Sequence, residues 1–169
     1  GVEKTLKSAE KYADNADIQA LASTVKEQWE AYQANPTGYF DSVELMELDT
    51  MIGGKGVNNI ELVKTLAGNS ADAIEWLSTI GADLKNVGQF GGAAVKRIHR
   101  PVNEDGKVIS VGSYIVPILE KTVEDRGVEV FYNTTANKII MKDGKAAGVE
   151  AEGKTGNKVT INAKSVVLA

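Results

Sequence analysis

The stretch RGVEVFYNTTANKIIMKDGKAAGVEAEGKTGNKVTINAKSVVLA, residues 126–169, decides the fold class of this chain. Two turn sequences, Lys142-Asp143-Gly144 and Lys154-Thr155-Gly156-Asn157, separate its apolar segments. Glycine-containing turns between short apolar segments are typical of β-hairpins. We therefore expect a three-stranded antiparallel meander with strands at 137–141, 146–151 and 159–162.

A further strand is expected on each side of the meander. Helical spacing of apolar residues predicts a helix over 113–126 that ends at Gly127, and a strand over 128–132 follows it at once. Residues 165–169, Ser-Val-Val-Leu-Ala, form a continuous apolar run of the kind found in a strand buried on both faces. No turn or polar tail follows this run, so we expect the natural polypeptide to continue past Ala169.

The N-terminal half predicts four helices, at about 3–13, 17–35, 41–53 and 58–80. Asp17 is expected to cap the second, and the spacings Asp41 to Glu44 and Asn58 to Glu61 suggest capping boxes for the last two. The second helix carries an apolar stripe of Leu21, Val25, Trp29 and Tyr32. The fourth is expected to pack through Leu62, Leu66, Ala73, Ile74 and Leu77. The expected fold class is α+β: a helical half, a helix-strand unit, and a meander with a returning buried strand.

Between residues 82 and 111 the periodicity disappears, and the segment 87–101 is rich in glycine and charge. This pattern predicts a long loop. A loop of about thirty residues is unusual inside a domain and is generally either functional or disordered.

Composition excludes several classes of function. The chain has 43% hydrophobic and 25% charged residues and a net charge of −4, with no basic run of the kind that nucleic-acid binding needs. It has no cysteine and one histidine, so disulfides, thiolate metal sites and histidine clusters are excluded. No run approaches the roughly 20 apolar residues of a membrane span, and no signal peptide is visible. The compartment, cytoplasmic or exported, stays open.

Few side chains suggest chemistry by themselves. Gly53-Gly54-Lys55-Gly56 lacks the spacing of a phosphate loop and is interpreted as a turn between helices. His99 and Arg100 suit either an anionic ligand or an ion pair with Glu104 or Asp105. Phe90 lies among glycines, where it either contacts a ligand or fills the core under the loop. Tryptophans and tyrosines at helical spacing are assigned to packing, and the scattered carboxylates to solvation.

Several motifs together resemble one known family. Asp49-Thr50-Met51-Ile52-Gly53-Gly54 is followed by Asn58-Asn59-x-Glu61-Leu62-Val63, and later by Gly91-Gly92-Ala93-x-Val95-x-Arg97-x-His99-Arg100-Pro101. With the helix, strand and meander behind them, these motifs resemble the flavoprotein subunit of the fumarate reductase and succinate dehydrogenase family. The likeness is greatest to soluble fumarate reductases of the flavocytochrome type and to urocanate reductases, and it covers about residues 42–169.

The resemblance implies a partial FAD-binding domain of the dinucleotide-binding type at 42–169 and a helical insertion at 1–41. The family's Gly-x-Gly-x-x-Gly turn and capping domain are not among these residues, so we expect an internal part of a larger protein that binds no FAD by itself. Ala136, with Thr135 beside it, matches the place whose backbone holds the adenine portion of FAD. Phe90 matches the loop that places an apolar side chain near flavin and substrate. No catalytic acid can be transferred, and His99 and Arg100 match the pattern without an assigned role.

For the whole protein, the resemblance implies an FAD-dependent oxidoreductase that transfers a hydride from reduced flavin to the C=C bond of an unsaturated carboxylate, most simply fumarate to succinate. Urocanate or another enoate is the alternative substrate, and a non-catalytic helical interaction module is the alternative class. Expected partners are the small carboxylate and an electron-donor domain or protein. This segment alone is expected to be inactive.

Overall fold

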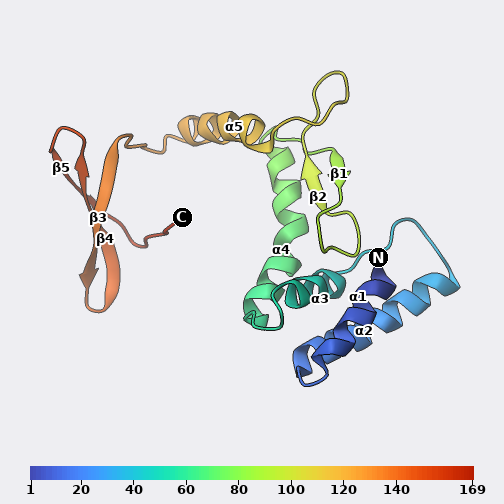
Figure 1. Ribbon diagram of the computed structural model, residues 1–169. Coiled ribbons are helices and arrows are strands. Elements are labelled where there is room, and N and C mark those ends of the chain that lie inside the picture. The colour runs from blue at the N-terminus through green and yellow to red at the C-terminus, as the bar shows by residue number, and fades with distance from the viewer. The chain divides into compact units, whose positions relative to one another are not determined.

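The chain forms helices in its first half and an antiparallel sheet near its end, which confirms the predicted α+β class (Figure 1). The computed structural model describes residues 1–169. They divide into two units, Gly1–Thr122 and Val123–Ala169, and each is described by itself.

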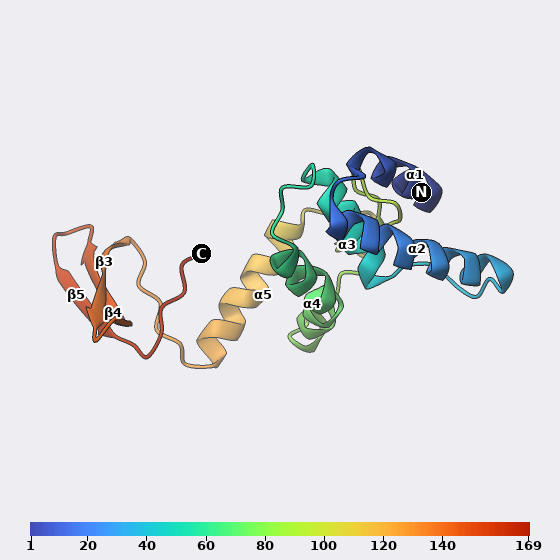
Figure 2. The same cartoon turned by 90° about the horizontal axis from the view of Figure 1, so that it is seen from below.

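The core of the first unit lies among its first three helices, α1 (Val2–Ala9), α2 (Ala16–Ala34) and α3 (Val43–Gly53). A short 3-10 turn, Glu10–Tyr12, connects α1 to α2. Both views show α1 and α2 side by side with α3 packed on them (Figures 1 and 2). The fully buried side chains that join α2 to α3 are Ile18, Val25, Leu45, Leu48 and Met51.

The helix caps lie close to the predicted positions but use other residues. The side chains of Asn15, Ser42 and Asn59 accept backbone N–H bonds at the starts of α2, α3 and α4 (Ile60–Thr79). Asp41, expected as the cap of α3, instead forms an ion pair with Arg97. The Gly53-to-Gly56 segment is a turn between α3 and α4, as predicted, with Lys55 and Gly56 at positive φ.

The face of α4 that packs on the core differs from the predicted one. Val63 and Ala67 are its buried residues, whereas Leu62 and Leu66 are 69% and 56% exposed. Small and β-branched side chains let α3 approach closely here. The expected apolar stripe therefore points elsewhere, and Leu66, Ala73 and Ile74 line an open groove instead.

The predicted long loop contains a short hairpin of β1 (Asn86–Gly88) and β2 (Ile98–Arg100). The glycine-rich segment 89–97 is the connection between these two strands. The hairpin was not predicted, because three-residue strands carry too few side chains for a period to be recognised.

The end of α5 (Val111–Asp125) and the sheet belong to the second unit. The helix stops as predicted at Gly127, which has φ +68°, while Val128 N–H bonds to the carbonyl of Val123. The meander is confirmed: β3 (Thr134–Lys142), β4 (Lys145–Gly153) and β5 (Lys158–Asn162) pair antiparallel in that order. Asp143 and Gly144 both have positive φ, which suits the two-residue turn between β3 and β4.

Two predicted strands are absent from the sheet. Residues 128–132 form no strand, so the helix-strand unit is a helix followed by irregular backbone. Residues 165–169 form no returning buried strand, and Val167 and Leu168 are 87% and 78% exposed. A strand needs a neighbour for its backbone groups, and neither segment has one among the described residues.

Candidate functional site

The glycine-rich connection between β1 and β2 presents an exposed aromatic side chain. Phe90 is 63% exposed, so in this structure it is not a plug in the core. The backbone beside it is open, because Gly91 and Gly92 have no atom within 4 Å of the place where a Cβ would lie. Phe90 and these glycines line a cavity of about 580 Å³ that also borders α1 and α3.

The end of this turn is fixed to α3 through Asp49. One carboxylate oxygen of Asp49 accepts hydrogen bonds from the Ala94 backbone N–H at 2.8 Å and from Arg97 Nη1 at 2.7 Å. The other oxygen accepts a 2.8 Å hydrogen bond from the Thr5 hydroxyl on α1. One side chain therefore ties together α1, α3 and the glycine-rich connection.

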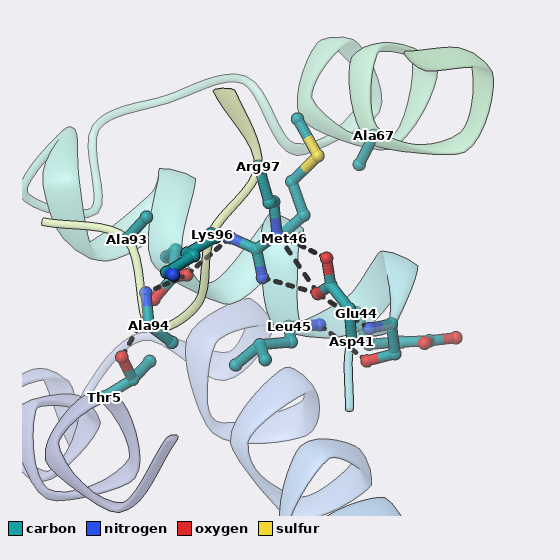
Figure 3. Close-up of polar contacts among 12 residues, drawn as sticks. Thr5, Asp41, Glu44, Leu45, Met46, Ala67, Ala93, Ala94, Lys96 and Arg97 are labelled. Carbon is teal, nitrogen blue, oxygen red and sulfur yellow. Dashed lines mark hydrogen bonds and ion pairs between the residues drawn. The ribbon is translucent and has the colours of Figure 1, made fainter. Parts of the chain in front are cut away.

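Arg97 joins the same carboxylate to a second one. Its Nε and Nη2 donate to Asp41 at 2.8–3.1 Å, in the fork geometry that suits a planar guanidinium. Figure 3 shows Arg97 reaching toward Asp41, with Ala94 and Thr5 on the other side of the cluster. We call Asp41, Asp49 and Arg97 the carboxylate-arginine cluster.

The cluster is partly to almost fully removed from water. The side chain of Asp49 is 6% exposed and that of Arg97 15%. Burial alone would lower the pKa of Arg97, but the hydrogen bonds to Asp41 and Asp49 outweigh burial and raise its pKa above the ordinary value. Removing one partner of such a pair typically costs about 3–5 kcal/mol, because the remaining charge stays buried and unpaired.

His99 and Arg100 lie on β2 and take no part in this cluster. His99 pairs with Val87 across the hairpin, and its Nδ1 lies 3.4 Å from the Leu84 carbonyl oxygen. Neither residue forms the ion pair with Glu104 or Asp105 that was one of the two interpretations.

Thr135 and Ala136 lie near the start of β3, in the second unit. β3 is an edge strand, so part of its backbone N–H and C=O groups face away from β4. The pairing with β4 is interrupted between Ala136 and Lys138. Thr135, Asn137 and Glu152 are among the residues that line a shallow cavity of about 500 Å³.

Thr135 and Ala136, which are neighbours in the chain, lie in the second unit, whereas Phe90 lies in the first. Sequence reasoning missed the carboxylate-arginine cluster, because it assigned the carboxylates to solvated helix faces. A signal was present in the sequence: Asp49 follows the apolar residue Leu45 by four positions, which places both on one face of the helix. A charge on the apolar side of a helix predicts a buried partner.

Comparison with known proteins places the chain in a class. The family described as "FAD binding domain" matches residues 28–169, so the chain belongs to that family. Within it, the chain is 37% identical over 130 residues to "Fumarate reductase (cytochrome)" of Shewanella frigidimarina, which is 76% of this chain and 22% of that protein.

Two further likenesses agree with the first. "NADH:fumarate oxidoreductase" of Klebsiella pneumoniae is 33% identical over 78% of this chain and 14% of its own length. The solved structure of the open conformation of a flavocytochrome c3 fumarate reductase matches with a TM-score of 0.70 and 37% identity, over 82% of this chain and 24% of that one. The chain therefore spans about a quarter or less of the length of these relatives. None of its helices combines the length and apolarity that crossing a membrane requires.

The residues present fit FAD in two respects. The free edge of β3 at Thr135 and Ala136 offers backbone donors and acceptors of the kind that recognise a purine. In the other unit, the open backbone of Gly91 and Gly92 beside Phe90 lets a flat ligand approach closely.

Proposed function

We propose that the protein to which this chain belongs is an FAD-dependent reductase that reduces the C=C bond of fumarate to give succinate. The observation that carries the proposal is the exposed Phe90 beside the open glycine backbone, in the connection that contains the fumarate reductase-like motif. When bound, FAD supplies the hydride, and a protein acid that is not assigned in this chain supplies the proton.

In this proposal, the residues of the chain bind FAD and exclude water from the active site. The backbone of Ala136, with Thr135 beside it, holds the adenine portion of FAD. Phe90 covers the region where flavin and substrate meet, and its apolar ring displaces water there. A drier site strengthens the electrostatic interactions that stabilise negative charge developing on the substrate.

Three finer statements belong to the same proposal. An electron-donor domain or protein reduces the flavin. Residues 1–41 are a helical insertion, and residues 42–169 are the partial FAD-binding domain.

The test is to purify the full-length protein with its flavin and to supply electrons from reduced methyl viologen. Fumarate-dependent oxidation of the dye, with succinate as product, is the expected result. Urocanate and acrylate offered under the same conditions decide between fumarate and another enoate.

A flavin-loaded protein that reduces none of these acids would contradict the proposal. Capture of a protein partner by the helices of the first unit would then favour the non-catalytic interaction module.

A further inference from the structure

We propose that Arg97 and Asp49 are positioning residues that hold the turn Phe90–Ala93 in place for the substrate; this inference rests on the proposed function. Neither side chain needs to touch the substrate in this role. They act through the backbone on which Phe90 stands.

The turn has few contacts of its own. Ala93 N–H bonds to the Phe90 carbonyl, and the Gln89 side chain bonds to the Ala93 carbonyl, so these bonds close the turn on itself. A Cβ added at Gly91 or Gly92 would meet no atom within 4 Å, and Gly92 has a φ of +95°. The local bonds define the shape of the turn but do not attach it to the rest of the unit.

Attachment comes from the four residues that follow. Ala94 N–H is bound by Asp49, Lys96 N–H by the hydroxyl of Tyr39, and the guanidinium of Arg97 by both Asp49 and Asp41. Ala94 is also buried in the core, with 7% exposure. The turn therefore projects from a base that is fixed immediately after Ala93, and the fixing is mainly ionic.

The charged contacts of Asp49 and Arg97 limit the movement of the backbone that follows Ala93. Asp49 accepts three hydrogen bonds, one from α1 and two from the glycine-rich connection, and a buried carboxylate with three partners has little freedom to move. Arg97 spans two carboxylates, which a lysine ammonium cannot bridge in the same geometry. A displacement of about 1 Å at a substrate-positioning group can lower the rate about a hundredfold.

The first measurement is amide exchange in this chain, with Arg97→Lys, Arg97→Met and Asp49→Asn compared with wild type. Faster exchange at Ala93 and Ala94, whose N–H groups are hydrogen-bonded, is expected for all three variants, with a larger increase there than in α2 and α3 and with Arg97→Lys least affected. Ile18→Ala is the control, because it removes a fully buried side chain next to Gly56 and so destabilises the unit at another place.

The second measurement uses the full-length flavoprotein. Per bound flavin, Arg97→Met should lower kcat/KM for fumarate about ten- to a hundredfold, chiefly through a higher KM, and Arg97→Lys should restore part of the loss. Ile18→Ala should lower the melting temperature and leave kcat/KM per bound flavin unchanged. A residue with a purely structural role would behave like this control.

The outcomes separate the two proposals. Unchanged exchange in the turn, or unchanged kcat/KM per flavin in an active enzyme, would overturn the positioning role while fumarate reduction stands. A wild-type protein without reductase activity would overturn the proposed function, and the exchange data would still decide whether Arg97 and Asp49 fix the turn.

Discussion

Because Phe90 is exposed, a role in catalysis can be tested separately from a role in packing. Because 63% of this residue is exposed, Phe90→Ala removes little buried area and should leave the melting temperature nearly unchanged. In the full-length enzyme, we expect turnover to fall by about one to two orders of magnitude, which corresponds to roughly 1.4–2.7 kcal/mol of transition-state stabilisation. Melting temperature, flavin content and turnover should be measured on one preparation.

The opposite pattern would remove Phe90 from the active site. A buried phenylalanine loses about 3–5 kcal/mol of stability when it is truncated to alanine. Such a loss, with unaltered turnover per bound flavin, would mean that Phe90 fills a core formed with the rest of the protein. Phe90→Leu serves as the control, since it keeps an apolar side chain over the same glycine backbone.

Glu47 provides a pH-dependent prediction at the same scale. It is 6% exposed on α3, and burial, followed by the nearby charge of Glu44, raises its pKa above the ordinary value of glutamate. The folded state therefore binds this proton more tightly than the unfolded state does. The stability from protonated Glu47 is fully present below about pH 4 and is lost as pH rises through the raised pKa.

Glu47→Gln should therefore increase the stability of the first unit at pH 7, and the gain should disappear toward pH 4. Denaturant midpoints from pH 4 to 8 measure this, with the exposed Glu27→Gln as the control for loss of one charge. A gain of the same size at pH 4 and pH 7 would show that the amide stabilises by packing and not through the titration.

Sequence patterns predicted the features of the elements that depend on neighbouring residues, such as caps and turns. They missed the features that depend on contacts between residues far apart in the chain. The helix starts were found within two residues and the meander was found, because caps and turns are local. The packed face of α4 was misassigned, because its apolar residues surround the helix and only contact with α3 selects Val63 and Ala67. Likewise, nothing in the sequence near Asp41 shows that Arg97, 56 residues later, is its partner.

The pairing of β4 with β5 depends on one glycine. A Cβ on Gly148 would clash with the backbone carbonyl oxygen of Ile161 on β5, and backbone cannot yield as a flexible side chain can. We expect Gly148→Ala to destabilise the sheet by about 1–3 kcal/mol. Amide exchange at Glu150 and Thr160, which face each other across the two strands, reports the loss directly.

The matched control for Gly148→Ala is Gly68→Ala in the middle of α4. No atom lies within 4 Å of the added methyl group there. Because alanine favours the helix, this change should stabilise the first unit by about 0.5–1 kcal/mol. If both changes proved neutral, the register between Gly148 and Asn162 would have to differ from the one described.

At the scale of the whole chain, the two units differ in what holds them together. The first has a core of fully buried side chains, whereas in the second only Gly148 and Ala151 are buried. A three-stranded sheet needs an apolar face packed on something to be stable. The exposed residues Val130, Phe131, Val167 and Leu168 are apolar surface of the kind that a larger domain would cover. The sequence pattern predicted strands in these segments, and the structure contradicts that prediction, because neither segment pairs with a neighbouring strand.

The same reasoning predicts how the 169-residue chain behaves toward FAD. Binding a dinucleotide relies on a glycine-rich turn at a helix N-terminus for the charged pyrophosphate, and these residues contain no Gly-x-Gly-x-x-Gly sequence. If Thr135 and Ala136 hold the adenine, the charged pyrophosphate of FAD still has no glycine-rich turn to bind it. We therefore expect the chain, expressed as these residues, to be colourless after desalting, whereas the full-length protein is yellow. Absorbance of flavin against protein concentration measures the occupancy. A stoichiometric flavin spectrum for residues 1–169 would contradict this prediction, and loss of that flavin in an Ala136→Pro variant would then place the binding surface on β3.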